Sequence, residues 1–135
     1  MKDKVVLITG GTSGIGEAAA LKFGEAGAKV VVSGRREAEG AKVVDAVKAA
    51  GGEATFVKAD IANEDEVKNL VGKTVEIYGG LDVAFNNAGV EIAGPITEVS
   101  REDYQRIFDI NVWGVVTSMK YEIPMMLERG GGSII

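Results

Sequence analysis

Residues 9–16 read Thr-Gly-Gly-Thr-Ser-Gly-Ile-Gly and join an apolar run at 5–8 to an alanine-rich segment at 17–26. Glycines let a backbone turn tightly and approach a phosphate closely. A helix that starts there points free N–H groups and its positive dipole end at an anion. This strand, glycine turn and helix therefore predict the phosphate-binding start of a dinucleotide-binding fold. A glycine-rich turn without a ligand is the alternative.

The spacing of the glycines also matches part of a nucleoside-triphosphate loop, which needs Lys and then Ser or Thr after its last glycine. Here Glu17 and Ala18 follow Gly16. A carboxylate at that place repels a triphosphate, and Ala18 has no oxygen to hold magnesium. The sequence therefore argues against an NTPase.

Composition restricts the class of protein further. The 135 residues are 46% hydrophobic and carry a net charge of −5. We therefore expect one folded domain over residues 1–135 and no nucleic-acid partner. No run of about 18 apolar residues occurs, so no membrane span is predicted. The first residues lack a signal-peptide pattern, which predicts a cytoplasmic location.

The chain has no Cys and no His. Disulfides, thiol nucleophiles, a Ser-His-Asp triad and the usual Cys/His zinc sites are thereby excluded, and no metal site is predicted. Any acid–base chemistry would have to come from Tyr, Lys, Asp or Glu.

Strand and helix patterns alternate along the chain. Helices are expected at 14–26, closed by Gly27, at 37–50, after the cap Asn63, and from the Ser100 cap to about 123, where Pro124 should kink or end the helix. Strands are expected at 4–9, 30–32, 53–59, 81–85 and from 133, with a loop over 88–99. This alternation predicts an α/β fold, a doubly wound parallel sheet (Rossmann-like) of strand order 3-2-1-4-5, incomplete at its C-terminal edge.

Four motifs together resemble the short-chain dehydrogenase/reductase family over the whole chain. They are the turn at 9–16, Asp60-Ile61, Asn86-Asn87-Ala88-Gly89, and Asn111 within Asp-Ile-Asn-Val. The resemblance implies an NAD(P)-dependent oxidoreductase that acts on a carbonyl or a secondary alcohol. It implies a cofactor site made of Gly10, Thr12, Ser13, Gly14, Ile15, Gly16, Asp60, Ile61, Asn87, Ala88 and Gly89.

Two of these motifs have simpler explanations that stay open. In the family, the Asp at the end of the third strand usually accepts a hydrogen bond from the adenine amine, but Asp60 is also compatible with a solvated loop carboxylate. Asn87-Ala88-Gly89 lines the cofactor site in the family, but an ordinary turn after a strand would have the same composition.

Asn111 shares a helix face with the apolar residues Tyr104, Phe108, Val112 and Val115, which predicts a buried amide. Such an amide needs partners, because leaving it unpaired costs about 1–3 kcal/mol. The resemblance assigns Asn111 to the family's catalytic tetrad, where it helps to hold a water. A core Asn bonded to nearby backbone is the alternative.

Cofactor choice is expected to depend on the end of the second strand. NAD-preferring members usually place a carboxylate there to bind the ribose 2′-hydroxyl. This chain has Gly34 followed by Arg35 and Arg36. Two guanidinium groups suit a 2′-phosphate, so NADP is favoured over NAD. A solvated start of the next helix is the alternative reading of the two arginines.

The family's catalytic Tyr and Lys, four positions apart on one helix, are not found. Four residues after the tyrosines come Asp82, Phe108 and Met125. We therefore expect the C-terminally truncated, cofactor-binding half of a reductase, inactive by itself. A non-catalytic nucleotide-binding module completed by a partner is the second hypothesis.

The resemblance also implies an assembly. The helix at 100–129 resembles the family's main subunit-contact helix, and an apolar edge strand invites pairing. A homo-oligomer through either surface is therefore predicted, whereas Trp113 packed against its own domain would be the alternative.

Overall fold

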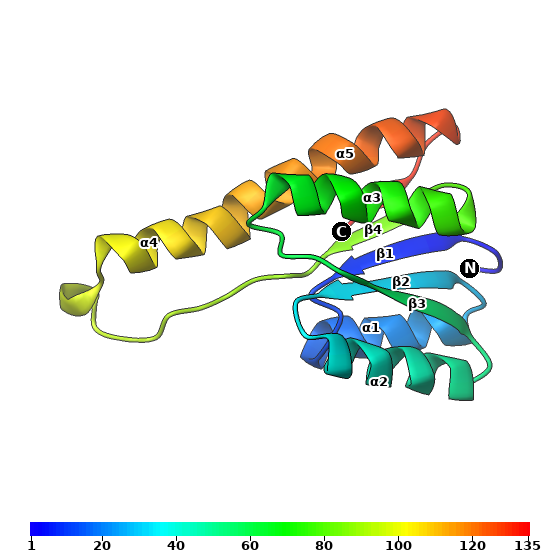
Figure 1. Ribbon diagram of the computed structural model, residues 1–135, viewed down its shortest axis with the longest axis horizontal. Helices are drawn as coiled ribbons and strands as arrows, with labels where there is room; N and C mark the ends of the chain where they lie inside the picture. The colour runs from blue at the N-terminus through cyan, green and yellow to red at the C-terminus, as the bar shows by residue number, and fades with distance from the viewer.

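The computed structural model describes residues 1–135 and contains one sheet of five parallel strands in the order β3-β2-β1-β4-β5 (Figure 1). The predicted doubly wound, Rossmann-like topology is confirmed. The strands are β1 Val5–Thr9, β2 Lys29–Gly34, β3 Glu53–Lys58, β4 Val83–Asn86 and β5 Ser133–Ile134. The helices are α1 Gly14–Glu25, α2 Glu37–Ala49, α3 Glu64–Tyr78, α4 Arg101–Phe108 and α5 Gly114–Glu128.

Helices cover both faces of the sheet and form two apolar clusters. Val6 and Ile8 of β1 pack with α1 and α2 on one face. Leu7, between them in sequence, packs with Leu70 of α3 and Met126 of α5 on the other. Successive residues of a strand point to opposite faces, so every residue of β1 is buried. This explains why the strand is a continuous apolar run rather than an alternating one.

Local signals set several helix ends as predicted. Asn63 caps α3 by accepting hydrogen bonds from the N–H groups of Asp65 and Glu66. Ser100 and Asp103 form a reciprocal capping box at the start of α4. Gly27 follows the end of α1 with φ +82°, a left-handed conformation that glycine adopts without strain.

The long helix after Ser100 differs from the prediction. It consists of α4, a π-helical turn over Asp109–Trp113, and α5, which continues to Glu128. Pro124 lies inside α5, so the prediction that the helix ends near residue 123 is wrong. Pro124 removes one backbone donor, but Glu122 and Met126 on either side of it are both buried, and this packing carries the helix past the proline.

Smaller boundary shifts occur near the C-terminal half. The fourth strand covers residues 83–86 rather than 81–85, and a short 3₁₀ turn at Ile96–Glu98 interrupts the predicted loop. Figure 1 shows α4 extending away from the sheet, linked to β4 by this loop. No helix has the length and apolar character that crossing a membrane would require.

Candidate functional site

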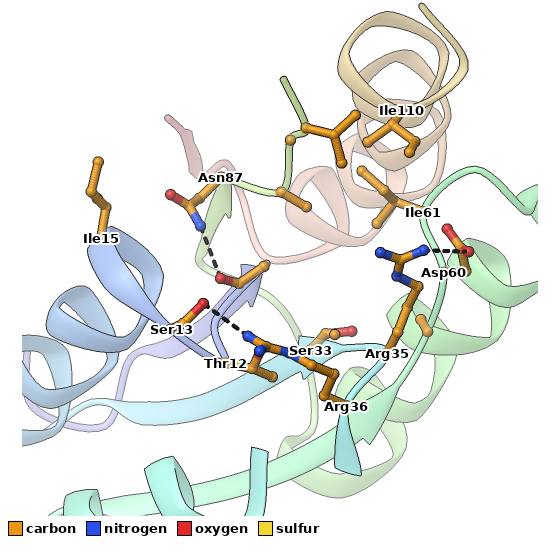
Figure 2. Close-up of a pocket in the computed structure, with 16 residues that line it drawn as sticks. Thr12, Ser13, Ile15, Ser33, Arg35, Arg36, Asp60, Ile61, Asn87 and Ile110 are labelled. Atoms are coloured by element: carbon orange, nitrogen blue, oxygen red, sulfur yellow. Dashed lines mark hydrogen bonds and ion pairs between the residues drawn. The ribbon is translucent and has the colours of Figure 1, made fainter. Parts of the chain in front are cut away.

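A cavity of about 380 Å³ opens where the strands of the parallel sheet end (Figure 2). Its walls come from the glycine turn, the end of β2, the end of β3 and the segment after β4. The residues that line it are Gly10, Thr12, Ser13, Ile15, Ser33, Gly34, Arg35, Arg36, Ala59, Asp60, Ile61, Asn87, Ala88, Gly89, Val90 and Ile110. The carboxyl ends of parallel strands are where this class of fold binds ligands.

Most of the residues expected at the cofactor site lie at this cavity. Gly14 and Gly16 of the glycine turn are not part of its lining, and neither is Asn111. These three residues therefore act on the cavity indirectly, through the backbone conformation and contacts described below.

Glycines shape the turn because side chains do not fit there. A Cβ on Gly10, which has φ +64°, would lie 2.7 Å from the Ala88 Cα atom. A Cβ on Gly16 would overlap the Gly10 carbonyl oxygen and approach the Asn87 amide to 2.7 Å. Gly14 has φ +57° with open space around it, so it is needed for backbone conformation only.

Asn87 holds the turn against the end of β4. Its Nδ2 group donates to the carbonyl oxygens of Thr9 and Gly10, both at 3.1 Å. The Ala88 N–H donates to the Thr9 hydroxyl at 3.2 Å. These three bonds join segments that are nearly 80 positions apart, so the turn and the segment after β4 form one unit.

The N-terminus of α1 faces this unit with its donors uncapped. Ser13 is the N-cap residue, but its side chain makes no capping hydrogen bond. Its hydroxyl instead accepts from Arg36 Nη2 at 3.0 Å, and the same nitrogen lies 3.3 Å from the Thr12 hydroxyl (Figure 2). A positive helix end and a guanidinium group are thus side by side, which is an arrangement that attracts anions.

The two arginines point to different walls of the cavity. Arg35 Nη1 lies 3.8 Å from Asp60 Oδ2, with both side chains partly exposed. Asp60 also accepts the Ala62 N–H at 3.0 Å, so part of its carboxylate supports the local loop. Gly34 packs closely against Thr12, whose Cγ2 atom would lie 2.8 Å from a Cβ. No carboxylate fits at residue 34 unless Thr12 moves.

Ile61 and Ile110 form the apolar end of the cavity. Both are buried and pack together with Val67. Gly114 makes this packing possible, because a Cβ there would lie 2.8 Å from Ile61 Cδ1. The sequence analysis missed Ile110, together with Ser33, Ala59 and Val90. Ser33 and Ala59 could have been predicted, because they lie at the carboxyl ends of strands, where this class of fold binds ligands. Ile110 lies in the π-helical turn, so helical periodicity did not mark it.

The prediction that Asn111 is buried on an apolar face is wrong. Asn111 is exposed, as are Tyr104, Phe108 and Val112, because this part of the helix extends away from the sheet (Figure 1). Its amide nitrogen and oxygen nevertheless each make one hydrogen bond. Asn111 Nδ2 donates to the Val90 carbonyl at 2.8 Å, and Oδ1 accepts the Val90 N–H at 2.9 Å. Asn111 therefore fixes the loop after β4 to the helix, beside the cavity wall.

None of the three tyrosines lines the cavity. The Tyr121 hydroxyl donates to Glu64 Oε1 at 2.9 Å, and Lys120 Nζ is 2.6 Å from the same oxygen. These hydrogen bonds, first that of Lys120, hold the pKa of the Glu64 carboxyl below its ordinary value. The hydrogen bond to Glu64 raises the pKa of Tyr121. This cluster joins α3 to α5 and supplies no proton donor to the cavity.

Comparison with known families identifies the class of protein. The sequence profile described as short chain dehydrogenase matches residues 4–135, which is nearly the whole chain. The chain belongs to this family of oxidoreductases.

Particular relatives agree with this assignment. An uncharacterized oxidoreductase from Thermotoga maritima is 45% identical over 98% of this chain and 52% of its own length. The 2,5-dichloro-2,5-cyclohexadiene-1,4-diol dehydrogenase of Sphingobium indicum is 44% identical over 100% of this chain and 54% of its own length. The chain thus spans about half the length of the curated relatives that it matches.

Solved structures show the same fold. Levodione reductase superposes with a TM-score of 0.95 at 31% identity, over 99% of this chain and 53% of its own. An NAD⁺-bound xylitol dehydrogenase gives a TM-score of 0.95 at 30% identity, over 98% of this chain and 52% of its own.

Proposed function

We propose that this chain forms the dinucleotide-binding part of an NADP(H)-dependent oxidoreductase that interconverts a carbonyl and a secondary alcohol. The observation that carries the proposal is the uncapped N-terminus of α1 beside Arg36. Backbone donors and a guanidinium group there offer a pyrophosphate and a 2′-phosphate their preferred partners. The substrate class comes from relatives named as dehydrogenases and reductases of small molecules.

Each wall of the cavity has a task in this proposal. The glycine turn with Ser13 and Ile15 would bind the pyrophosphate, and Arg36, with Arg35 nearby, would bind the 2′-phosphate. Asp60 and Ile61 would bind the adenine, and Asn87, Ala88 and Gly89 would line the remainder of the cofactor site. When bound, the cofactor supplies or accepts the hydride.

The catalytic Tyr and Lys of the family have no counterpart at the cavity, where no Tyr or Lys is found. We therefore expect these 135 residues to bind dinucleotide without turning over substrate. Asn111 would position the loop at Val90 rather than transfer a proton itself. A nucleotide-binding module completed by another chain is the second candidate, and the same absence favours it.

Binding of NADPH and NADH, measured separately by calorimetry, tests the proposal. We expect NADPH to bind the purified chain more tightly than NADH. Arg36→Ala should weaken NADPH binding about tenfold or more, because a hydrogen bond to a charged group is lost, and should leave NADH nearly unchanged. Arg101→Ala, an exposed arginine on α4 away from the cavity, is the matched control. Equal affinity for both cofactors would contradict the choice of NADP.

A further inference from the structure

Glu122 is a fully buried carboxyl group that the proposed function does not use. It lies on α5 at 0% exposure, beneath the end of β4. Asn86, the last residue of β4, donates from Nδ2 to Glu122 Oε2 at 2.9 Å. No other side chain is bonded to either group.

One oxygen on each side of this pair has no partner. Asn86 Oδ1 and Glu122 Oε1 are both buried and both lack a hydrogen bond. An ionised carboxylate has no proton to offer, so it would leave both acceptors unsatisfied in a low-dielectric site. A proton on Oε1 would supply the missing donor, and its natural acceptor is Asn86 Oδ1. A neutral acid and a primary amide then bond to each other in both directions.

No positive group offsets a charge on Glu122. On α3 and α5, Lys120 and Tyr121 both donate hydrogen bonds to Glu64. Asp82, just before β4, is bonded to Lys4 and lies near Arg129. Tyr78 of α3 lies under the Lys29 ammonium group. Burial raises the pKa of Glu122 to about 7, and the Asn86 bond opposes this only in part.

We propose that Glu122 is a positioning residue of the dinucleotide site, whose neutral carboxyl pairs reciprocally with the Asn86 amide and so fixes the end of β4. The next residue, Asn87, holds the glycine turn through the Thr9 and Gly10 carbonyl oxygens. Ionisation of Glu122 breaks half of the pair and loosens this connection. The inference rests on the proposed function for its effect on cofactor binding, but not for the protonation of Glu122.

The protonation is tested first, without cofactor. The side-chain carboxyl carbon of Glu122 is followed by ¹³C NMR from pH 4 to pH 9 and assigned by its disappearance in Glu122→Gln. We expect ionisation only near pH 7. Ionisation near the ordinary glutamate pKa would overturn the proposal, whatever the cofactor does.

The positioning role is then tested by the pH profile of NADPH affinity. Glu122→Gln keeps both hydrogen bonds to Asn86 and cannot ionise. Titration of the cofactor affects both proteins equally, so it cancels when their dissociation constants are compared. The ratio of dissociation constants, wild type to Glu122→Gln, should be near one at pH 6. It should rise about fivefold by pH 8.5, as expected for the loss of one buried hydrogen bond.

Two further variants complete the design. Glu122→Leu should bind NADPH weakly at every pH, because it leaves both Asn86 groups unpaired. Glu128→Gln, an exposed carboxyl on the same helix, should follow the wild type. A ratio that stays constant with pH would overturn the positioning role. An absence of NADPH binding in all proteins, with Glu122 still ionising near pH 7, would refute the proposed function and with it the positioning role, and would leave only the acid–amide pair.

Discussion

Two regions of the molecule bury their apolar side chains very differently. One is the half of the sheet that carries the glycine turn, and the other is the helical segment of residues 101–128. All five residues of β1 are buried between helices on both faces. On α4, the π-helical turn and α5, seven large apolar side chains remain more than 40% exposed. They are Tyr104, Phe108, Val112, Trp113, Val116, Ile123 and Leu127.

This contrast has a structural cause. β1 lies at the centre of the sheet, with β2 on one side and β4 on the other. The helical segment is covered on one side, where α5 packs against α3 and β4. Similar apolar residues are therefore core in one region and surface in the other, according to whether a second layer covers them. The predicted homo-oligomer would provide such a layer and stays a prediction.

The largest expected effect compares two leucines. Leu7→Ala on β1 removes a side chain that is 1% exposed and should lower the free energy of unfolding by about 2–5 kcal/mol. Leu127→Ala on α5, where the side chain is 68% exposed, should change it by less than about 0.5 kcal/mol. Urea unfolding of both variants measures the difference. A comparable cost for Leu127→Ala would mean that another copy of the chain covers the helical segment.

A pH-dependent effect of intermediate size is expected inside the helical segment. The folded-state pKa of Glu122 lies above its unfolded value of 4.5, at about 7. The folded state therefore binds the proton more tightly, and this contribution is fully present below pH 4.5 and lost as the pH rises through about 7. The loss amounts to about 3 kcal/mol. The difference in unfolding free energy between wild type and Glu122→Gln should fall across this range, and a constant difference would contradict it.

A smaller effect is expected where the helical segment joins the sheet. Asn111→Ala removes both hydrogen bonds to Val90. Because the site is exposed, the protein should lose only about 1 kcal/mol of stability. The Val90 amide should exchange with solvent faster. Gln105→Ala, at an exposed residue of α4 whose side-chain amide makes no hydrogen bond, is the control. Unchanged exchange at Val90 would show that the loop is held by other contacts.

The smallest effect is expected at Gly72, which we compare with Gly40, a second glycine in a helix interior. A Cβ on Gly72 of α3 meets no atom, so Gly72→Ala should stabilise the protein by about 0.5–1 kcal/mol through helix propensity. A Cβ on Gly40 of α2 would overlap the Phe56 ring, so Gly40→Ala should destabilise it by about 1–3 kcal/mol. Thermal melts compare the two. Destabilisation by Gly72→Ala would indicate a packed neighbour on that face of α3.

Much of the fold and part of the candidate site followed from local patterns. The glycine turn, the Asn63 and Ser100 caps and the apolar runs fixed the elements, and the handedness of crossover connections fixed the strand order. Among the cavity residues, Ser13 and Asn87 were expected from the family resemblance and Arg36 from its place after the second strand, and all three follow strands whose carboxyl ends meet at one edge. In a parallel sheet, the position of a residue after its strand is enough to place it at that edge.

The tertiary structure decided what depends on distant neighbours. Asn111 was expected in the core, but its surroundings depend on a π-helical turn and on a loop 21 positions earlier. Nothing in the local sequence marks Glu122 as buried, but α5 packs beneath β4 and buries it against Asn86, 36 positions away. Local sequence therefore determined the strands, helices and turns. Burial and hydrogen-bond pairing between remote segments were decided only by packing, because the free energy of a side chain depends on what surrounds it in space.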